Sequence, residues 1–187
     1  MIILKTKRLI LRTWNEQDLD PMSAINQDPL VCEFLPQVGN RAATKTLIQL
    51  FINHYEKYGF TAYAVELKSN SKFIGFVGLL IPSFEAHFTP AVEIAWRLDS
   101  QLWGKGYATE AAKAVVDFAF TTLKLEEVVS FTAENNIRSR RVMEKIDMHH
   151  YPHDDFDHPK LPTDSPLCRH VLYRLTPIEN KQQENDI

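Results

Sequence analysis

The chain has 187 residues, enough for one domain with a substantial core, and its 44% hydrophobic and 24% charged content is ordinary for a globular protein. The net charge of -3 argues against direct nucleic-acid binding, which usually needs a basic excess or a clustered basic stripe. No apolar run approaches the ~18 residues of a membrane span, and Cys32 and Cys168 lack metal or redox spacing, so we expect a soluble cytoplasmic protein without a membrane partner.

In chain order, hydrophobic periodicity and turn residues predict five elements in the first half of the sequence. Apolar residues alternate in the strands and recur every three to four positions in the helices, while Gly59 and Pro82 end the elements before them. The elements are a strand at 2–13, a helix at 15–25, a helix at 42–57 and two strands at 61–67 and 73–81. The turn at 69–71 makes the last two strands a hairpin.

The most informative stretch is residues 101–111, where Gly104 and Gly106 lie between a strand and a helix. Residues 91–98 alternate with the strand period, and residues 107–123 carry alanines at the helical period. A loop at a helix N-terminus presents free N–H groups and the positive end of the macrodipole, so main chain alone can hold a phosphate. Glycines remove the Cβ atoms that would keep it away. The alternative is that the glycines only connect strand to helix.

The loop matches neither a Walker loop nor the dinucleotide-binding pattern, because Thr109 stands where the latter has its third glycine. Its pattern is Q-x-x-G-x-G, formed by Gln101, Gly104 and Gly106 after a strand that carries Glu93. This pattern resembles the acyl-CoA pyrophosphate loop of the GNAT superfamily of N-acetyltransferases.

A second segment, residues 136–148, supports the same resemblance. A strand at 128–132 leads into a helix for which Asn136 is a natural N-cap. The segment is similar to N-x-x-S-x-x-V-x-E-K-x-G-[FM] of the RimJ/RimL-like branch, with Asp147 in place of the glycine. Residues 4–18 also resemble the first strand and helix start of that branch.

The resemblance implies an α+β GNAT fold, a mixed, mostly antiparallel twisted sheet with helices on both faces and a central βαβα acyl-CoA-binding unit. A last strand is predicted at 167–175. We expect a single N-acetyltransferase domain over residues 1–176 and a polar tail at 177–187, in a monomer or a homodimer.

The resemblance also implies an enzyme that uses acetyl-CoA as its acyl donor and no metal. The acceptor is expected to be a primary amine, either a protein N-terminal α-amine of the ribosomal-protein type or a small amine such as a polyamine. A catalytically silent acyl-CoA-binding sensor or interaction module is the alternative from another functional class. The expected acyl-CoA contacts come from Trp96, Arg97, Leu98, Gln101, Trp103, Gly104, Lys105, Gly106, Tyr107, Ala108, Thr109 and Asn136.

Two residues match catalytic positions of the family. An ammonium acceptor has no lone pair, so acetyl transfer needs a base, and the departing thiolate needs a proton donor. Glu93 matches the base, and Ser139 matches the serine that RimL-like enzymes are thought to place near the CoA sulfur. Some relatives use a tyrosine four residues later, where this chain has Met143, so the donor is Ser139, Tyr151 or Tyr173, or water. A solvated Glu93 and a merely helix-capping Ser139 are the structural alternatives.

Residues 149–158 gather four histidines and three aspartates. Their spacing matches no zinc motif, and Pro152 and Pro159 break the stretch into a loop. We expect a solvated acidic loop, with the alternative that its aspartates attract a cationic acceptor. Several aromatic residues belong either to the core or to the wall of an acceptor pocket, namely Trp14, Phe34, Phe51, Tyr55 and Phe84.

Overall fold

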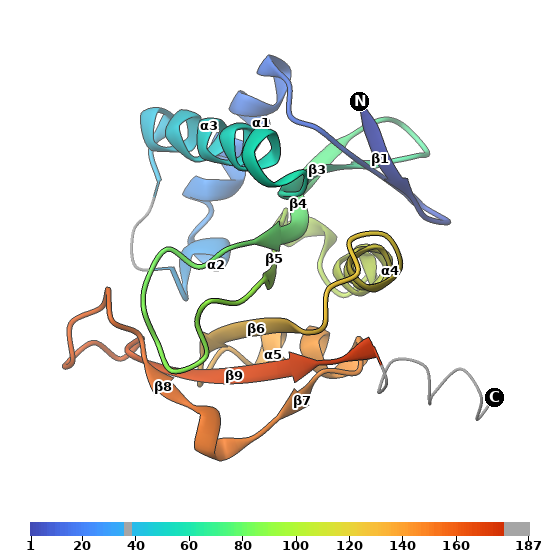
Figure 1. The fold of residues 1–187 in the computed structure, drawn as a ribbon. Coiled ribbons are helices and arrows are strands. Elements are labelled where there is room, and N and C mark those ends of the chain that lie inside the picture. Colours follow the sequence, from blue (N-terminus) through green and yellow to red (C-terminus); the bar gives the residue numbers. More distant parts are fainter. Residues whose placement is uncertain (36–38, 178–187) are drawn as a thin grey trace. The chain divides into compact units, whose positions relative to one another are not determined.

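The computed structural model describes residues 1–35 and 39–177, which form two compact units (Figure 1). The N-terminal unit comprises residues 1–80 and 95–115, and the C-terminal unit comprises residues 81–94 and those from 116 onward. The prediction of one domain over residues 1–176 stays a prediction. Of the predicted tail, 177–187, all but Pro177 lies outside the described residues.

Four strands make an antiparallel sheet in the N-terminal unit. β2 pairs with β1 on one side and with β3 on the other, and β3 pairs with β4. The end of β5 lies beside β4, where the Asp99 amide donates to the Ile74 carbonyl at 2.9 Å. The strands are β1 (Ile2–Lys5), β2 (Leu9–Arg12), β3 (Ala62–Leu67), β4 (Phe73–Leu80) and β5 (Glu93–Leu98).

The prediction of a single strand at 2–13 is wrong, because the chain reverses between β1 and β2. The Thr6 amide donates to the Leu9 carbonyl at 3.0 Å, and the Leu9 amide donates to the Thr6 hydroxyl at 3.0 Å. A threonine that captures a main-chain amide in this way builds a tight turn without glycine or proline. The apolar alternation continues through such a turn, so the periodicity does not reveal it.

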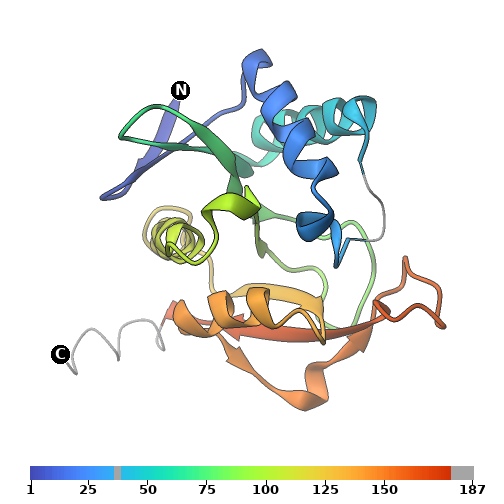
Figure 2. The ribbon, with the colours of Figure 1, turned by 180° about the vertical axis from the view of Figure 1, so that it is seen from behind.

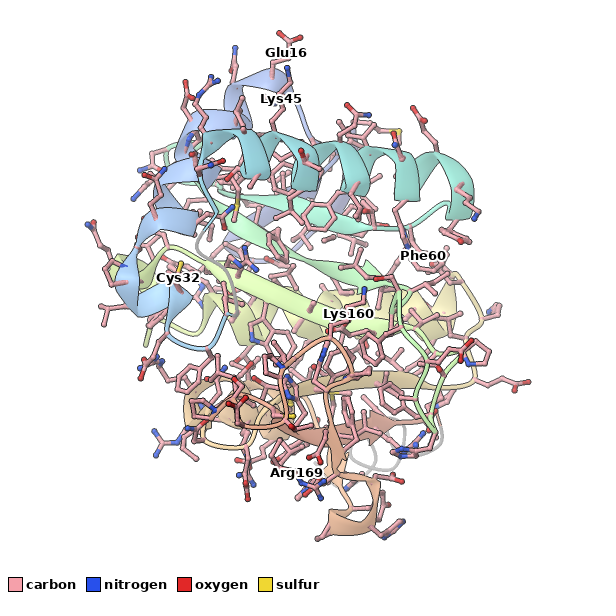
Figure 3. The ribbon with its side chains drawn as sticks, turned by 90° about the vertical axis from the view of Figure 1, so that its left-hand side faces the viewer. Glu16, Cys32, Lys45, Phe60, Lys160 and Arg169 are labelled. Atoms are coloured by element: carbon pink, nitrogen blue, oxygen red, sulfur yellow. The ribbon has the colours of Figure 1, made fainter. Side chains whose placement is uncertain are left out.

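Helices cover one face of this sheet. The helix predicted from Asn15 is confirmed as a short 3-10 turn, η1 (Glu16–Asp18), followed by α1 (Leu19–Gln27), and Asn15 forms the predicted cap. α2 (Pro29–Cys32) follows, and α3 (Arg41–Tyr58) ends at Gly59 in the left-handed conformation, φ +77°. α1 and α3 lie side by side (Figures 1 and 2), and Phe60 lies just beyond the C-terminal end of α3 (Figure 3). The core between helices and strands includes Trp14, Met22, Ile25, Ile48, Phe51, Ala62, Ala64, Phe73 and Phe76.

The C-terminal unit is built on β9, which pairs antiparallel with β6, β7 and β8. The start of β5 pairs in parallel with β6, with Glu93 opposite Val129. α5 lies across one face of β6 and β9 (Figure 2) and buries Met143 and Ile146. The elements are β6 (Val128–Ala133), α5 (Ile137–Lys145), β7 (His149–His150), η3 (Pro152–Asp154), β8 (Phe156–Asp157) and β9 (Arg169–Leu175).

The predicted α+β class with a mixed, mostly antiparallel sheet is confirmed by these pairings. The substitution of Asp147 for the glycine of the resembling pattern leaves the turn intact, since Asp147 adopts the left-handed conformation at φ +66°. Aspartate is one of the few side chains that accept this conformation at modest cost. Among the described residues, no helix is both long and apolar enough to cross a membrane.

Candidate active site

The predicted phosphate loop joins η2 (Ser100–Leu102) to α4 (Tyr107–Thr121). Gly104 and Gly106 have φ values of +76° and +78°, in the left-handed region that favours glycine. The Glu110 amide donates to the Gly106 carbonyl at 3.0 Å, so the first helical hydrogen bond starts at Gly106. Both glycines are therefore required by the backbone conformation itself, in addition to the close approach that the sequence suggested.

The main-chain N–H groups from Gly104 to Thr109 have no hydrogen-bond acceptor in the part of the chain that the structure describes. They belong to an exposed loop and to the first turn of a 15-residue helix, whose macrodipole is positive at this end. Consecutive free N–H groups at such a terminus form a binding site for phosphate. The loop can thus hold the pyrophosphate of an acyl-CoA by main chain alone.

The turn between β1 and β2 holds the loop from outside. Glu110 in the first turn of α4 accepts hydrogen bonds from the Thr6 hydroxyl at 2.6 Å, the Arg8 amide at 2.7 Å and Arg8 Nε at 2.6 Å. These donors outweigh the effect of partial burial and lower the pKa of Glu110. The Arg8 guanidinium also lies over the Tyr107 ring, 4.4 Å from its centroid.

Arg8 fixes the orientation of one peptide group in the loop. Its Nη1 donates to the Lys105 carbonyl at 2.9 Å. In a planar trans peptide the carbonyl and the next N–H point in opposite directions, so this bond turns the Gly106 N–H away from Arg8. Residues 4–18 entered the sequence prediction only through a family resemblance, and this role of Arg8 could not be predicted because its contact with Glu110 spans 102 positions.

The residues before the loop are held by short-range bonds. Asp99 caps η2 by accepting from the Gln101 amide at 3.1 Å and pairs with Lys72 at 2.9 Å. The Trp103 indole donates to the Leu98 carbonyl at 2.9 Å, which holds the ring against the end of β5, as the sequence analysis expected for packing on this strand. Gln101 is exposed and Trp96 is partly buried.

Glu93 lies on the C-terminal unit's sheet beside an aromatic cluster. Paired residues on neighbouring strands share a face of the sheet, so Glu93 lies on the face of Val129, where Phe131 follows two positions later. Among the described residues, no hydrogen bond or ion pair reaches its carboxyl group. Burial raises the pKa of Glu93 to about 8 although part of the side chain touches solvent. Glu93 therefore differs from the solvated strand glutamate that was the structural alternative.

The aromatic cluster consists of six rings that pack against one another from four separate stretches of the chain. Phe88, Phe156 and His170 are buried, and Phe84, Phe131 and His158 are partly exposed. Burial lowers the pKa of His170 to about 4, so this imidazole is neutral at pH 7. Together these rings place an apolar surface on the sheet face that carries Glu93.

Three of the five aromatic residues named for the core or for an acceptor pocket meet in the N-terminal unit, whereas Phe84 lies in the C-terminal unit. Trp14 and Phe51 are buried in the core of the N-terminal unit, where their rings stack at 5.6 Å. Tyr55 joins them at the wall of a shallow cavity of about 130 Å³. Phe84 belongs to the aromatic cluster of the C-terminal unit.

Asn136 and Ser139 occupy the predicted helix start of α5. The Asn136 side chain accepts from the Ser139 amide at 3.3 Å, which confirms the cap, and donates to the Thr132 hydroxyl at 2.9 Å. The Ser139 hydroxyl has no hydrogen-bond partner within residues 1–35 and 39–177, and the residue is only partly buried. Its side chain is thus available to a ligand.

The two tyrosines considered as donors differ in their surroundings. The Tyr173 hydroxyl donates to Glu144 Oε1 at 3.2 Å and accepts from Arg140 Nε at 3.3 Å, and burial raises its pKa. Its ring is 2% exposed, whereas Tyr151 is exposed. Tyr173 is therefore already bound within its own unit.

The histidine and aspartate stretch is more ordered than expected, because it includes β7, η3 and β8. Each aspartate has a partner: Asp154 pairs with Arg174 at 2.7 Å, Asp155 with His150 at 2.7 Å, and Asp157 with Arg169 at 3.3 Å. No group of three or more His, Cys, Asp or Glu side chains that could hold a metal occurs among the described residues. The expected solvated acidic loop is corrected to a segment in which Asp154 and Asp157 pair with arginines and Asp155 is hydrogen-bonded to His150, so its field on a cationic acceptor is reduced.

Comparison with known proteins agrees with this site. The profile of the family described as "Acetyltransferase (GNAT) domain" matches residues 8–149. The chain belongs to the GNAT acetyltransferase family. It is an N-acetyltransferase of a family that uses acetyl-CoA, and the expected enzyme class is confirmed.

The relatives and solved structures that resemble this chain match it at low sequence identity. An uncharacterized N-acetyltransferase of Bacillus subtilis, YnaD, is 28% identical over 145 residues, which cover 78% of this chain and 81% of the relative. RimL, a ribosomal L7/L12 alpha-N-protein acetyltransferase solved with coenzyme A, superposes with a TM-score of 0.76 at 14% identity, covering 94% and 98% of the two chains. Spermidine N-acetyltransferase from Vibrio cholerae superposes with a TM-score of 0.72 at 16% sequence identity, covering 92% of this chain and 98% of that chain. The two structures therefore show the shared fold alone.

Proposed function

We propose that this acetyltransferase belongs to the RimJ/RimL-like branch and transfers the acetyl group of acetyl-CoA to a primary amine. The candidate acceptors are the α-amine of a protein N-terminus, as in ribosomal-protein acetylation, and a small amine. The observation that carries the proposal is the main-chain phosphate loop, and the chain also has a glutamate whose pKa lies near neutral pH. A general base works best when its pKa is close to the working pH.

The loop from Gly104 to Thr109 holds the pyrophosphate, and the residues from Trp96 to Leu98, with Asn136, contact the rest of the acyl-CoA. Support for the loop comes from its free N–H groups and the two left-handed glycines. Because main chain provides the phosphate contacts, side-chain changes at Lys105 or Thr109 are expected to affect binding less than changes at the glycines.

In the reaction, Glu93 takes a proton from the ammonium, and the free amine attacks the thioester carbonyl directly. The new bond joins nitrogen to the acetyl carbon, and the carbon–sulfur bond breaks with its electron pair on sulfur. As the carbon–sulfur bond breaks, the nitrogen loses its second proton, which reaches the thiolate through Ser139 or water. The apolar surroundings of Glu93 support its role, because they keep the proton affinity of the carboxylate high.

The test is a thiol-release assay with acetyl-CoA across N-terminal peptides, polyamines and aminoglycosides. We expect steady release of free CoA with at least one class, and loss of release in the Glu93→Gln protein. The alternative, a silent acyl-CoA-binding module, predicts binding of acetyl-CoA without turnover for any amine. Lys7→Ala, on the turn beside the loop but without a contact to it, is the matched control.

A further inference from the structure

Arg97 in the N-terminal unit is a half-buried cation in an unusual setting. Its Nη1 donates to Asn26 Oδ1 at 2.7 Å, and its guanidinium carbon lies 5.5 Å from the centroid of the Phe76 ring. The Asn26 amide is held in this orientation because its Nδ2 donates to the Thr44 hydroxyl at 2.9 Å. Burial lowers the pKa of Arg97 below its ordinary value. The side chain is thus fixed in place by neutral groups.

No carboxylate pairs with Arg97 among the described residues. Asp28, at the start of α2, is committed to the Ser100 hydroxyl and to the Leu30 amide. Cys32 (Figure 3), at the end of α2, contributes a thiol whose Sγ donates to the Asn26 carbonyl at 2.9 Å. Among the described residues, neither Asp28 nor another carboxylate therefore bonds to this guanidinium.

Arg12, in the same unit, is an arginine whose charge is paired with carboxylates. Its guanidinium pairs with Asp18 at 2.7 Å and with Glu66 at 2.6 Å. Buried charges are normally paired in this way, since an unpaired one is costly to remove from water. The contrast between Arg12 and Arg97 points to a ligand for Arg97 from outside the chain.

The free donors of Arg97 define the chemistry of that ligand. A guanidinium has five N–H donors in a planar fork, and only one of them is used by Asn26. Such a fork matches a carboxylate, which it binds through two parallel hydrogen bonds. The pyrophosphate of acyl-CoA is assigned to the loop at Gly104 to Thr109, and we take the acceptor as the source of the anion at Arg97.

We propose that the Arg97 side chain binds a carboxylate of the acceptor, so that the substrate is an amine that also carries a carboxylate. This inference rests on the proposed acetyl transfer, in which the acceptor supplies a primary amine. Free amino acids and N-terminal segments with an acidic side chain both present this chemistry. Polyamines do not, and the ion-paired aspartates of residues 154–157 offer little to attract them.

The kinetic test uses acceptor pairs that differ only in the carboxylate. One pair is a free amino acid and its amide, and the other is an N-terminal peptide with Glu or Gln at its second position. We expect kcat/KM to be about ten- to hundredfold higher for the carboxylate member, the range of a charge-assisted pair. Which pair shows the preference distinguishes a free amino acid from a protein N-terminus.

The substitution Arg97→Met should reduce this ratio to about one, and Arg97→Lys should retain part of it, because lysine keeps the charge but lacks the fork. Melting temperature separates recognition from structure. Arg97→Met is expected to melt at or above the parent, since it replaces an unpaired buried charge, whereas Arg12→Met should melt lower because it leaves two carboxylates unpaired.

Two outcomes overturn the inference: equal kcat/KM for both members of every pair, or a preference that survives in Arg97→Met. If no amine turns over, the proposed function fails, and propionate then tests Arg97 without catalysis. Propionate at fixed ionic strength should raise the melting temperature of the parent but not of Arg97→Met. An equal effect on both proteins would exclude a carboxylate site at Arg97.

Discussion

The raised pKa of Glu93 makes a quantitative prediction about the pH dependence of catalysis. A base must be ionised to accept a proton, and with a pKa of about 8 only about 9% of Glu93 is ionised at pH 7. With an alkylamine acceptor of pKa about 10.4, the amine stays protonated across the window from pH 6 to pH 9. We therefore expect kcat/KM to rise about 50-fold between pH 6 and pH 8 and then to level off.

Glu93→Gln should strongly lower kcat/KM and remove its rise between pH 6 and pH 8. General acid–base groups contribute about 10² to 10⁴ in rate, and the loss should be largest above pH 8, where the parent carboxylate is ionised. Steady-state thiol release across pH 6–9 measures this, with acetyl-CoA binding as the control for folding. A loss below tenfold, or an inflection near pH 8 that persists in Glu93→Gln, would show that Glu93 is not the base.

The same pKa predicts the pH dependence of stability. The unfolded carboxyl ionises near its ordinary pKa of 4.5, while the folded one holds its proton to about pH 8. Between these values the folded state binds more protons, so the free energy of unfolding falls as pH rises, by at most about 1.4 kcal/mol per pH unit. Water that reaches the partly exposed side chain reduces this slope. Denaturant unfolding at pH 5 and pH 8 should show that the free energy of unfolding of the parent is lower at pH 8, and that the difference is smaller in Glu93→Gln.

Three further changes test the loop and the backbone. Saturating CoA, at about 100 times its Kd, should stabilise the parent by about 2.7 kcal/mol and raise its melting temperature. Gly106→Val places a β-branched residue at φ +78° and should abolish this rise. Normal CoA binding by Gly106→Val would show that the loop does not hold the pyrophosphate. Arg8→Ala should weaken acetyl-CoA binding about tenfold by freeing the Lys105 peptide, whereas Lys7→Ala should change the binding little. If calorimetry gives the same increase in Kd for both variants, Arg8 acts through its charge alone and not by orienting the peptide. Lys124 has a left-handed backbone conformation at φ +57°, which is strained for a side chain with a Cβ atom, so Lys124→Gly should raise the free energy of unfolding by about 1 kcal/mol. An unchanged melting temperature would show that this conformation is not strained.

Local signals in the sequence were sufficient to predict much of the fold. The cap at Asn136, the stop at Gly59 and the strand–loop–helix around Gly104 each depend on residues a few positions apart. In these cases the side chain or the glycine acts on its own neighbourhood, and the structure places each element within a few residues of the predicted bounds. The resemblance to GNAT loops then identified the family before any geometry was known.

Properties that arise from distant contacts could not be predicted in this way. The contact of Arg8 with Glu110, the Arg97 environment at Asn26 and the pairing of Asp154 with Arg174 join residues 20 to 102 positions apart. The pKa of Glu93 depends on burial by elements that the periodicity of its own strand does not contain. Composition therefore predicted a solvated acidic loop, with attraction of a cationic acceptor as the alternative, whereas the aspartates have partners in the structure and the proposed role of Arg97 requires an anionic group on the acceptor.

The candidate proton donors differ in whether their hydroxyl is already bonded. Tyr173 is bound by Arg140 and Glu144, and Met143 cannot donate a proton, which leaves Ser139, Tyr151 and water. Of these we expect Ser139, because it matches the family's position for this role. A thiol of pKa about 8.5 leaves readily as a thiolate, and a single hydrogen bond contributes about 0.5–1.5 kcal/mol. Ser139→Ala should thus lower kcat about two- to tenfold, with Ser139→Thr close to the parent. Tyr173→Phe should lower the melting temperature and leave kcat unchanged; the reverse pattern in single-turnover assays would assign the donor to Tyr173.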